Sequence, residues 1–203
     1  RPDYATVVYS NLIRRTYKHT PIILGGTEAS LRRMAHYDYW SNAIRRSILV
    51  DSQADLLIYG MGERAIIEIA ADLQQGIEVG NIQDVQGTCY RVPNKDYAWD
   101  YLELPSFAEV RADKKRFAEA FKLEYLEQDP IRGRRLVQQN DEWCVVQNPP
   151  ALPLTEEQMD EVYDLPYMRT YHPIYEKAGG VPAIKEVQFS LVSQRGCFGG
   201  CNF

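Results

Sequence analysis

Residues 54–76 read ADLLIYGMGERAIIEIAADLQQG, and the pattern of this stretch changes twice. Ala54–Tyr59 is a short apolar run, which predicts a buried β-strand. Gly60-Met61-Gly62 predicts a tight turn, since glycine adopts backbone conformations that are costly for other residues. Glu63–Gln75 then predicts a helix, ended by Gly76, whose buried positions are Ile66, Ile69, Ala70 and Leu73. Strand, turn and helix in this order are typical of α/β proteins.

The N-terminal residues show a related order. A helix over residues 3–17 is predicted by apolar residues at helical spacing, namely Ala5, Val8, Tyr9 and Leu12. Ile22–Gly26 follows Pro21 and predicts a second buried strand that ends in glycines. We expect Thr27 to cap a short helix that begins at Glu28.

Two segments between these units are less regular. Ser47–Val50 predicts an extended segment, and Met34–Trp40 predicts a polar-aromatic loop or a helix end. We expect residues 1–105 to form one α/β accessory domain with a Rossmann-like, doubly wound sheet. Such a domain is an open parallel sheet with helices on its faces.

Residues 106–182 are expected to connect this domain to the C-terminal residues 183–203. Ser106–Gln128 predicts a charged helix with an apolar stripe. Arg134–Gln139 and Trp143–Gln147 flank a short polar turn, which predicts a β-hairpin. A proline-rich linker over residues 148–153 precedes a helix that Thr155 caps and that runs to about Tyr163.

The composition is that of an ordinary globular chain. Its 203 residues are 45% hydrophobic and 25% charged, with a formal net charge of -5. An acidic chain lacks the electrostatic footprint of a nucleic-acid binder, and three nearby arginines, Arg132, Arg134 and Arg135, are weak support for RNA. No apolar run approaches the roughly 18 residues of a membrane span, and no secretory pattern opens the chain. We therefore expect a cytoplasmic protein with no membrane partner and no supported nucleic-acid partner.

The cysteines fall into two groups. Cys89 and Cys144 each lie alone in a strand-like run and are predicted to be buried structural thiols. Cys197 and Cys201 enclose Phe198-Gly199-Gly200, and such a glycine loop can curl around an iron–sulfur cluster with its N–H groups toward the sulfides. The residues alone leave four interpretations open: ligands of a cluster, half of a zinc site, a redox pair, or unrelated thiols.

A dinucleotide fingerprint is a further interpretation of the glycine turn. Gly60–Ala65 fits the Gly-x-Gly-x-x-Ala variant between a strand and a helix. However, Glu63 would place a like charge beside a pyrophosphate, and Asp84, at about the right distance for the ribose, ends no apolar strand. An ordinary strand-to-helix turn at the rim of a cleft is therefore favoured.

Isolated histidines and aromatic residues have structural explanations. His36 and His172 are expected to pack or to cap rather than to catalyse. Core packing is favoured over a ligand patch for Tyr37, Tyr39 and Trp40.

Several segments carry a resemblance to a known family. They are PIILGGTEASLRR at 21–33, HYDYW at 36–40, YGMGE at 59–63, DLPY at 164–167, HP at 172–173 and FSLVSQRGCFGGCNF at 189–203. Together they resemble the YgiQ-type radical S-adenosylmethionine (SAM) proteins. The upstream portion of that family resembles a cobalamin-binding fold, so the accessory domain is expected to be cobalamin-binding-domain-like.

The resemblance implies a chemistry and a set of residues. Three cysteines would hold a 4Fe-4S cluster: Cys197, Cys201 and one directly after Phe203. Phe203 itself would lie on the adenine side of SAM. Such an enzyme takes an electron from a donor and cleaves SAM reductively to a 5′-deoxyadenosyl radical. Its substrate, small or macromolecular, is not indicated.

The resemblance also implies how the chain ends. Residues 183–203 would be the first strand, over Glu186–Val192, and the cluster loop of a radical SAM partial barrel. Because the chain opens at Arg1 without methionine and closes inside this loop, we expect an internal fragment, cut at both ends and inactive alone. Cobalamin is a weaker expectation, because neither His19 nor His36 lies in an Asp-x-His-x-x-Gly motif. The alternative is a Rossmann-like module that binds cobalamin or a nucleotide, or docks a partner, with incidental cysteines.

Overall fold

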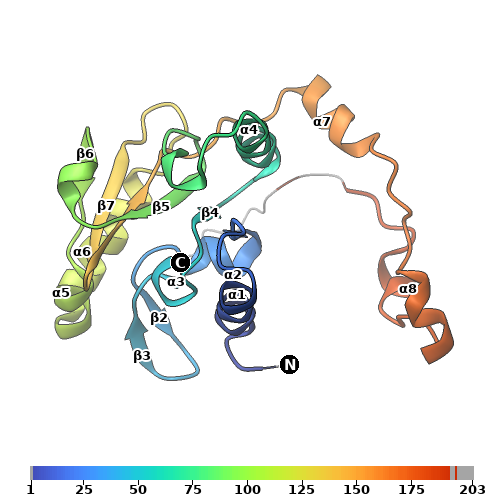
Figure 1. Ribbon diagram of the computed structural model, residues 1–203, viewed down its shortest axis with the longest axis horizontal. Coiled ribbons are helices and arrows are strands. Elements are labelled where there is room, and N and C mark those ends of the chain that lie inside the picture. Colours follow the sequence, from blue (N-terminus) through green and yellow to red (C-terminus); the bar gives the residue numbers. More distant parts are fainter. Residues whose placement is uncertain (1, 193–194, 196–203) are drawn as a thin grey trace. The chain divides into compact units, whose positions relative to one another are not determined.

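The computed structural model describes residues 2–192 and residue 195. The chain divides into two compact units, Arg1–Leu154 and Thr155–Phe203. The division expected near residue 105 lies inside the first unit, because strands from both sides of that position pair in one sheet. Figure 1 shows the elements coloured along the chain.

The first unit is built on a six-stranded sheet with the strand order β1-β4-β5-β8-β7-β6. Its strands are β1 (Ile23–Leu24), β4 (Leu56–Ile58), β5 (Thr88–Val92), β6 (Tyr101–Glu103), β7 (Arg135–Asn140) and β8 (Trp143–Gln147). The outer pairs β1–β4 and β6–β7 are parallel, and the pairs between them are antiparallel. The α/β class is confirmed and the arrangement is consistent with a Rossmann-like fold, but the sheet is mixed rather than all-parallel.

Helices cover both faces of this sheet. Successive side chains of a strand point to opposite faces, so Leu56 and Leu57 belong to different apolar clusters. The helices packed on the Leu57 face are α1 (Ala5–Thr16), α2 (Gly26–Leu31), α3 (Ile48–Asp51) and α6 (Lys114–Leu126). On the Leu56 face lie α4 (Glu63–Gln74) and η1 (Val79–Asn81), a short 3-10 helix.

Residues 54–76 form the predicted strand, turn and helix. All residues of β4 are buried, and Gly60 has a φ of +68°, in the region that favours glycine. The face of α4 that meets the sheet differs from the expected one. Ile69 is fully buried beside Ala65, and Leu73 packs partly, but Ile66 and Ala70 are exposed. The helix therefore contacts the sheet through a narrower stripe than its apolar content suggests.

Three local predictions in residues 27–50 are wrong in whole or in part. Ser47–Val50 is not extended, because the Ser47 hydroxyl accepts a hydrogen bond from the Leu49 N–H (3.2 Å) and caps α3. Met34–Trp40 is a loop only at its two ends, since β2 (His36–Asp38) pairs there with β3 (Ala43–Arg45) in a separate hairpin. Thr27 caps nothing, because α2 already begins at Gly26.

The segment from 106 to 147 belongs to the sheet unit. The helix predicted over Ser106–Gln128 is two helices, α5 (Phe107–Ala112) and α6, because Asp113 leaves the helical conformation and caps α6 through the Lys115 N–H (2.8 Å). The predicted hairpin is confirmed as β7–β8. It lies within the sheet, so these residues are not a connector. The 3-10 helix η2 (Lys95–Tyr97) precedes β6.

The second unit contains α7 (Glu156–Tyr163), the 3-10 helix η3 (Pro173–Ala178) and α8 (Ile184–Val187). Thr155 caps α7 in a capping box, as predicted. The strand expected over Glu186–Val192 is wrong: α8 occupies its beginning, and residues 188–192 are not assigned to a strand. Across the part of the chain that the structure describes, every helix is too short or too polar to cross a bilayer.

Candidate functional site

The carboxyl ends of β1 and β4 lie side by side at one edge of the sheet, because these strands are parallel. After β1 the chain enters α2 on the Leu57 face, and after β4 it enters α4 on the opposite face. The Gly60 N–H donates to the Ser30 hydroxyl (3.1 Å), which ties the two connections together. In open α/β sheets, ligands bind outside the carboxyl ends of strands where the helices diverge in this way. This edge is the first candidate site.

Arg33, just beyond α2, reaches across the same edge. Its Nε donates to Gln147 Oε1 (2.7 Å), a terminal nitrogen donates to the Ser30 carbonyl (2.5 Å), and its Cζ lies 5.0 Å from the centroid of the Tyr59 ring. Tyr59 follows β4, and Gln147 ends β8, which runs in the same direction as β4. Arg33 therefore links the carboxyl ends of two strands.

A buried carboxyl group completes this cluster. The carboxylate of Glu124, on α6, lies 4.0 Å from the Arg33 guanidinium, and the two side chains are only 17% and 15% exposed. Burial raises the pKa of Glu124 to about 7, against the opposing effect of the Arg33 charge. Burial also raises the pKa of Tyr59, and that of Cys89 to about 12. Near neutral pH, Glu124 can therefore take up or release a proton while the phenol and the thiol stay protonated.

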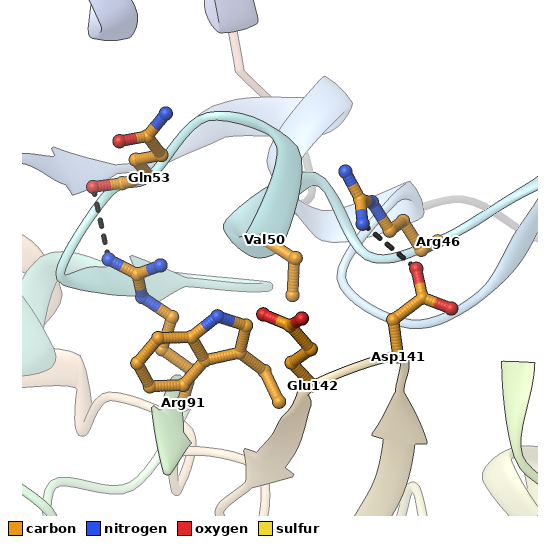
Figure 2. A pocket seen from close by; sticks show the side chains of 7 residues that line it. Arg46, Val50, Gln53, Arg91, Asp141 and Glu142 are labelled. Atoms are coloured by element: carbon orange, nitrogen blue, oxygen red, sulfur yellow. Dashed lines mark hydrogen bonds and ion pairs between the residues drawn. The ribbon is translucent and has the colours of Figure 1, made fainter. Parts of the chain in front are cut away.

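The second candidate site is a hollow of about 630 Å³ at the opposite end of strands β4 and β8, drawn in Figure 2. An Arg46 nitrogen donates to Asp141 Oδ2 (2.8 Å), and an Arg91 nitrogen donates to the Gln53 carbonyl (3.4 Å). The Arg91 Cζ also lies 4.8 Å from the centroid of the Trp143 ring. Since both guanidinium groups already contact the chain's own groups and Glu142 adds a further carboxylate to the lining, charge selects neither an anion nor a cation here.

The residues predicted to bind a cluster and SAM, Cys197, Cys201 and Phe203, lie outside the described residues, so their roles stay predictions. Cys89 and Cys144 are buried free thiols, as predicted, and the Cys144 thiol donates to Gln139 Oε1 (2.8 Å). Within residues 2–192 and 195, no three or more His, Cys, Asp or Glu side chains gather as a metal site.

The histidines have the expected structural roles. His172 Nδ1 accepts a hydrogen bond from the Ile174 N–H (3.2 Å) and caps η3. His36 Nδ1 contacts the Met34 carbonyl oxygen (3.1 Å), and burial lowers the pKa of this imidazole.

The aromatic residues of the β2–β3 hairpin differ from the prediction. Tyr37, Tyr39 and Trp40 are 51%, 79% and 86% exposed, so core packing is wrong for all of them. The rings of Tyr39 and Trp40 meet edge to face, with centroids 6.2 Å apart. They lie around the hairpin turn, where neither face of the six-stranded sheet covers them.

Two other binding interpretations lose support. Asp84 lies before β5 with its side chain 80% exposed, 3.4 Å from Arg135, so it does not occupy the ribose-binding position after a strand. Of the clustered arginines, Arg134 bonds to Glu127 and Arg135 bonds to the Trp99 carbonyl. These contacts engage Arg134 and Arg135 within the fold, whereas the Arg132 side chain is 88% exposed.

Arg33 and Glu124 were not singled out from the sequence. Glu124 lies four residues after Ala120, which is 4% exposed, so both residues are on the packed face of α6. The sequence signal that could have pointed to Glu124 is an acidic residue on the packed face of a helix. Nothing in the sequence near Arg33 indicated that its partner would come from position 124.

Comparisons with known proteins show which family and which curated proteins this chain is similar to. A family model described as radical SAM N-terminal matches residues 1–190. A UPF0313 protein of Clostridium botulinum (strain ATCC 19397 / Type A) is 58% identical over 203 residues, which cover 100% of this chain and 32% of the relative. For a UPF0313 protein of Clostridium perfringens (strain 13 / Type A), identity is 57% over 204 residues, covering 100% of this chain and 31% of the relative. The chain thus spans about a third of the length of these curated relatives. No solved structure matches it significantly.

Proposed function

Because this chain belongs to the radical SAM N-terminal family, we propose that it is the α/β accessory part of a radical SAM iron–sulfur enzyme. The observation that carries the proposal is the family match over residues 1–190, together with the cysteines that follow it at 197 and 201. In this proposal Cys197 and Cys201 are two of the three protein ligands of a 4Fe-4S cluster.

The cysteines of this chain fit the role of cluster ligands in part. A cluster needs thiolates, and burial raises the pKa of Cys89 to about 12, which keeps that cysteine protonated. Cys144 is buried and bonded to Gln139. Cys197 and Cys201 are thus the cysteines left for a cluster, and a third ligand would come from a residue after Phe203.

Each residue of the loop has a proposed task. Cys197 and Cys201 hold the metal, and Gly199-Gly200 allows the backbone to approach it closely. Phe203 lies on the adenine side of SAM. The chemistry that the cluster supplies when bound is one-electron reductive cleavage of SAM. An external electron donor is required, and the substrate is left open.

The test uses the full-length protein, loaded anaerobically with iron and sulfide. Cys197→Ala and Cys201→Ala should each lose bound iron and the visible absorbance of the cluster. Cys144→Ala, a buried cysteine outside the loop, should retain both. If both loop variants bind iron and sulfide as the parent does, the ligand assignment is wrong.

A second candidate function rests on the edge formed by β1 and β4. Helices diverge there behind glycine turns, as in Rossmann-like ligand sites, so the unit could bind a nucleotide. Calorimetric titration of the full-length cysteine variants with NAD, cobalamin and SAM separates the two functions. Tight binding of NAD or cobalamin without a cluster would favour the ligand-binding module. We expect neither to bind.

A further inference from the structure

Helix α1 exposes three large apolar side chains, while its one buried residue is polar. Ser10 is 4% exposed, whereas Tyr9, Leu12 and Ile13 are 52%, 51% and 41% exposed. Residues 9, 12 and 13 share one face of a helix, as their spacing requires. The opposite face is the one that packs: Val7 contacts the apolar cluster, and the Asn11 amide donates to the Asp51 carbonyl (3.2 Å). An amphipathic surface helix normally has the reverse arrangement.

The contacts at both ends of α1 show how it runs. Near its start, the Thr6 hydroxyl donates to Glu28 Oε2 (2.6 Å), and Glu28 lies in α2, which follows the carboxyl end of β1. Near its end, Arg14 contacts Asp55 Oδ2 (2.5 Å), and Asp55 directly precedes β4. Figure 1 shows α1 and α2 together beside the sheet. Because β1 and β4 are parallel, α1 runs antiparallel to both. This is the geometry of a helix that connects two parallel strands.

Among the described residues, β1 has a neighbour on one side only. The Ile22 carbonyl accepts hydrogen bonds from the Asp55 and Leu56 N–H groups, so it faces β4. Backbone groups of successive residues in a strand point to opposite sides. The N–H and C=O of Ile23 therefore face the other, open side of β1. An open edge of this kind is ready to pair with another strand.

Chirality decides where a strand leading into α1 would lie. Strand–helix–strand connections between parallel strands are right-handed in nearly all proteins. Both α1 and α2 lie on the Leu57 face, and the chain passes from β1 through α2 to β4. A strand before α1 must then lie on the side of β1 away from β4. That place is the open edge of β1.

We infer that a strand from the residues preceding Arg1 in the full-length protein pairs in parallel with β1, and that Tyr9, Leu12 and Ile13 cover it. The curated relatives are about three times as long as this chain, so these relatives hold residues outside the matched stretch. The carboxyl end of this strand would lie beside the carboxyl ends of β1 and β4, next to the turns Gly25-Gly26 and Gly60-Met61-Gly62. It thereby adds a third loop to the candidate ligand site. This inference concerns the α/β unit and is independent of the cluster.

Photo-cross-linking in the full-length protein tests the occupant directly. Leu12 is replaced by benzoylphenylalanine, the protein is irradiated, and the cross-linked peptides are identified by mass spectrometry. The expected product is intramolecular and joins position 12 to a peptide preceding Arg1. Position 126 is the matched control, since Leu126 ends α6 and is 60% exposed. It should give no cross-link to that peptide.

The other outcomes overturn the inference. A cross-link from position 12 to a peptide after Phe203 would assign the face to the downstream part, and a cross-linked dimer would assign it to a second copy. If neither Leu12 nor Ile13, each replaced in turn by benzoylphenylalanine, gave any cross-link, this face of α1 would be exposed to solvent. Hydrogen exchange adds a second readout: the Ile23 amide should be protected at least tenfold more in the full-length protein than in a version beginning at Arg1. Equal exchange in both proteins contradicts pairing at this edge.

Discussion

The Glu124 carboxylate lies 4.0 Å from the Arg33 guanidinium, in a largely buried cluster at the carboxyl edge of the sheet. Burial raises the pKa of Glu124 from its ordinary 4.5 to about 7, so the folded state holds this proton more tightly than the unfolded state. Stability contributed by the protonated form is therefore present below about pH 4.5 and is lost as the pH rises toward 7.

Glu124→Gln should remove this pH dependence, because glutamine stays neutral. Between about pH 5 and pH 8 the variant should gain roughly 2–3 kcal/mol in unfolding free energy relative to the parent. Urea unfolding at a series of pH values measures the difference. Glu68→Gln, an exposed site on α4, is the control and should follow the parent at every pH. A constant difference between Glu124→Gln and the parent would show that Glu124 is already ionised at pH 5.

Asn140→Ala should destabilise the first unit by about 1–3 kcal/mol. The Asn140 side chain is fully buried and accepts a hydrogen bond from the Ser47 N–H (2.9 Å). Alanine would leave that buried donor without its partner, at the residue that caps α3. Chemical denaturation measures the loss. Glu142→Ala, in the exposed turn of the same hairpin, should change stability by less than about 0.5 kcal/mol.

The contact between Ser47 and Asn140 also shows which structural features a local sequence pattern does not predict. The order of strand, turn and helix at 54–76 was predicted correctly because local pattern decides it: an apolar run, two glycines and a periodic helix. The buried face of that helix was predicted only in part, since Ile66 and Ala70 are exposed. Ser47–Val50 has residues typical of a strand, yet it is helical, since its cap and its partner Asn140 depend on side-chain hydrogen bonds. A residue 93 positions away is invisible to a local pattern.

The aromatic hairpin and the expected final strand failed for related reasons. Aromatic content predicted that Trp40 is buried, but burial depends on whether another element covers the turn. Glu186–Val192 has a strand-like pattern, but a strand forms only where another strand pairs with it, which sequence alone does not reveal. The candidate cluster of Arg33, Tyr59, Glu124 and Gln147 combines four separate segments, so only the fold brings it together.

Asp38→Asn should destabilise the β2–β3 hairpin in a pH-dependent manner. Hydrogen bonds from Ser41 and Tyr4, with Arg32 nearby, hold the pKa of the buried Asp38 carboxyl below its usual range. A lowered pKa gives stability that is present above about pH 4 and is lost as the pH falls further. The difference in unfolding free energy between parent and variant should therefore be largest at neutral pH and shrink in acid. A difference that is unchanged at about pH 2 would contradict a role for the charge.

Trp40→Ser should leave stability within about 0.5 kcal/mol of the parent, because the indole is 86% exposed. Val145→Ala, at a fully buried position in β8, is the contrasting variant and should cost at least 1 kcal/mol or so. Thermal unfolding of both variants measures the contrast. A loss for Trp40→Ser as large as that for Val145→Ala would mean that the hairpin turn is covered.

The most direct measurement is the formation of 5′-deoxyadenosine by the full-length protein, loaded with iron and sulfide, reduced and supplied with SAM under anaerobic conditions. The parent should form it, and Cys197→Ala and Cys201→Ala should fall to the background of a protein-free control. Cys144→Ala should retain activity comparable to that of the parent. Product formation that persists in both loop variants, or a cluster-loaded parent that forms none, would contradict the assignment of this chain to a SAM-cleaving enzyme through Cys197 and Cys201.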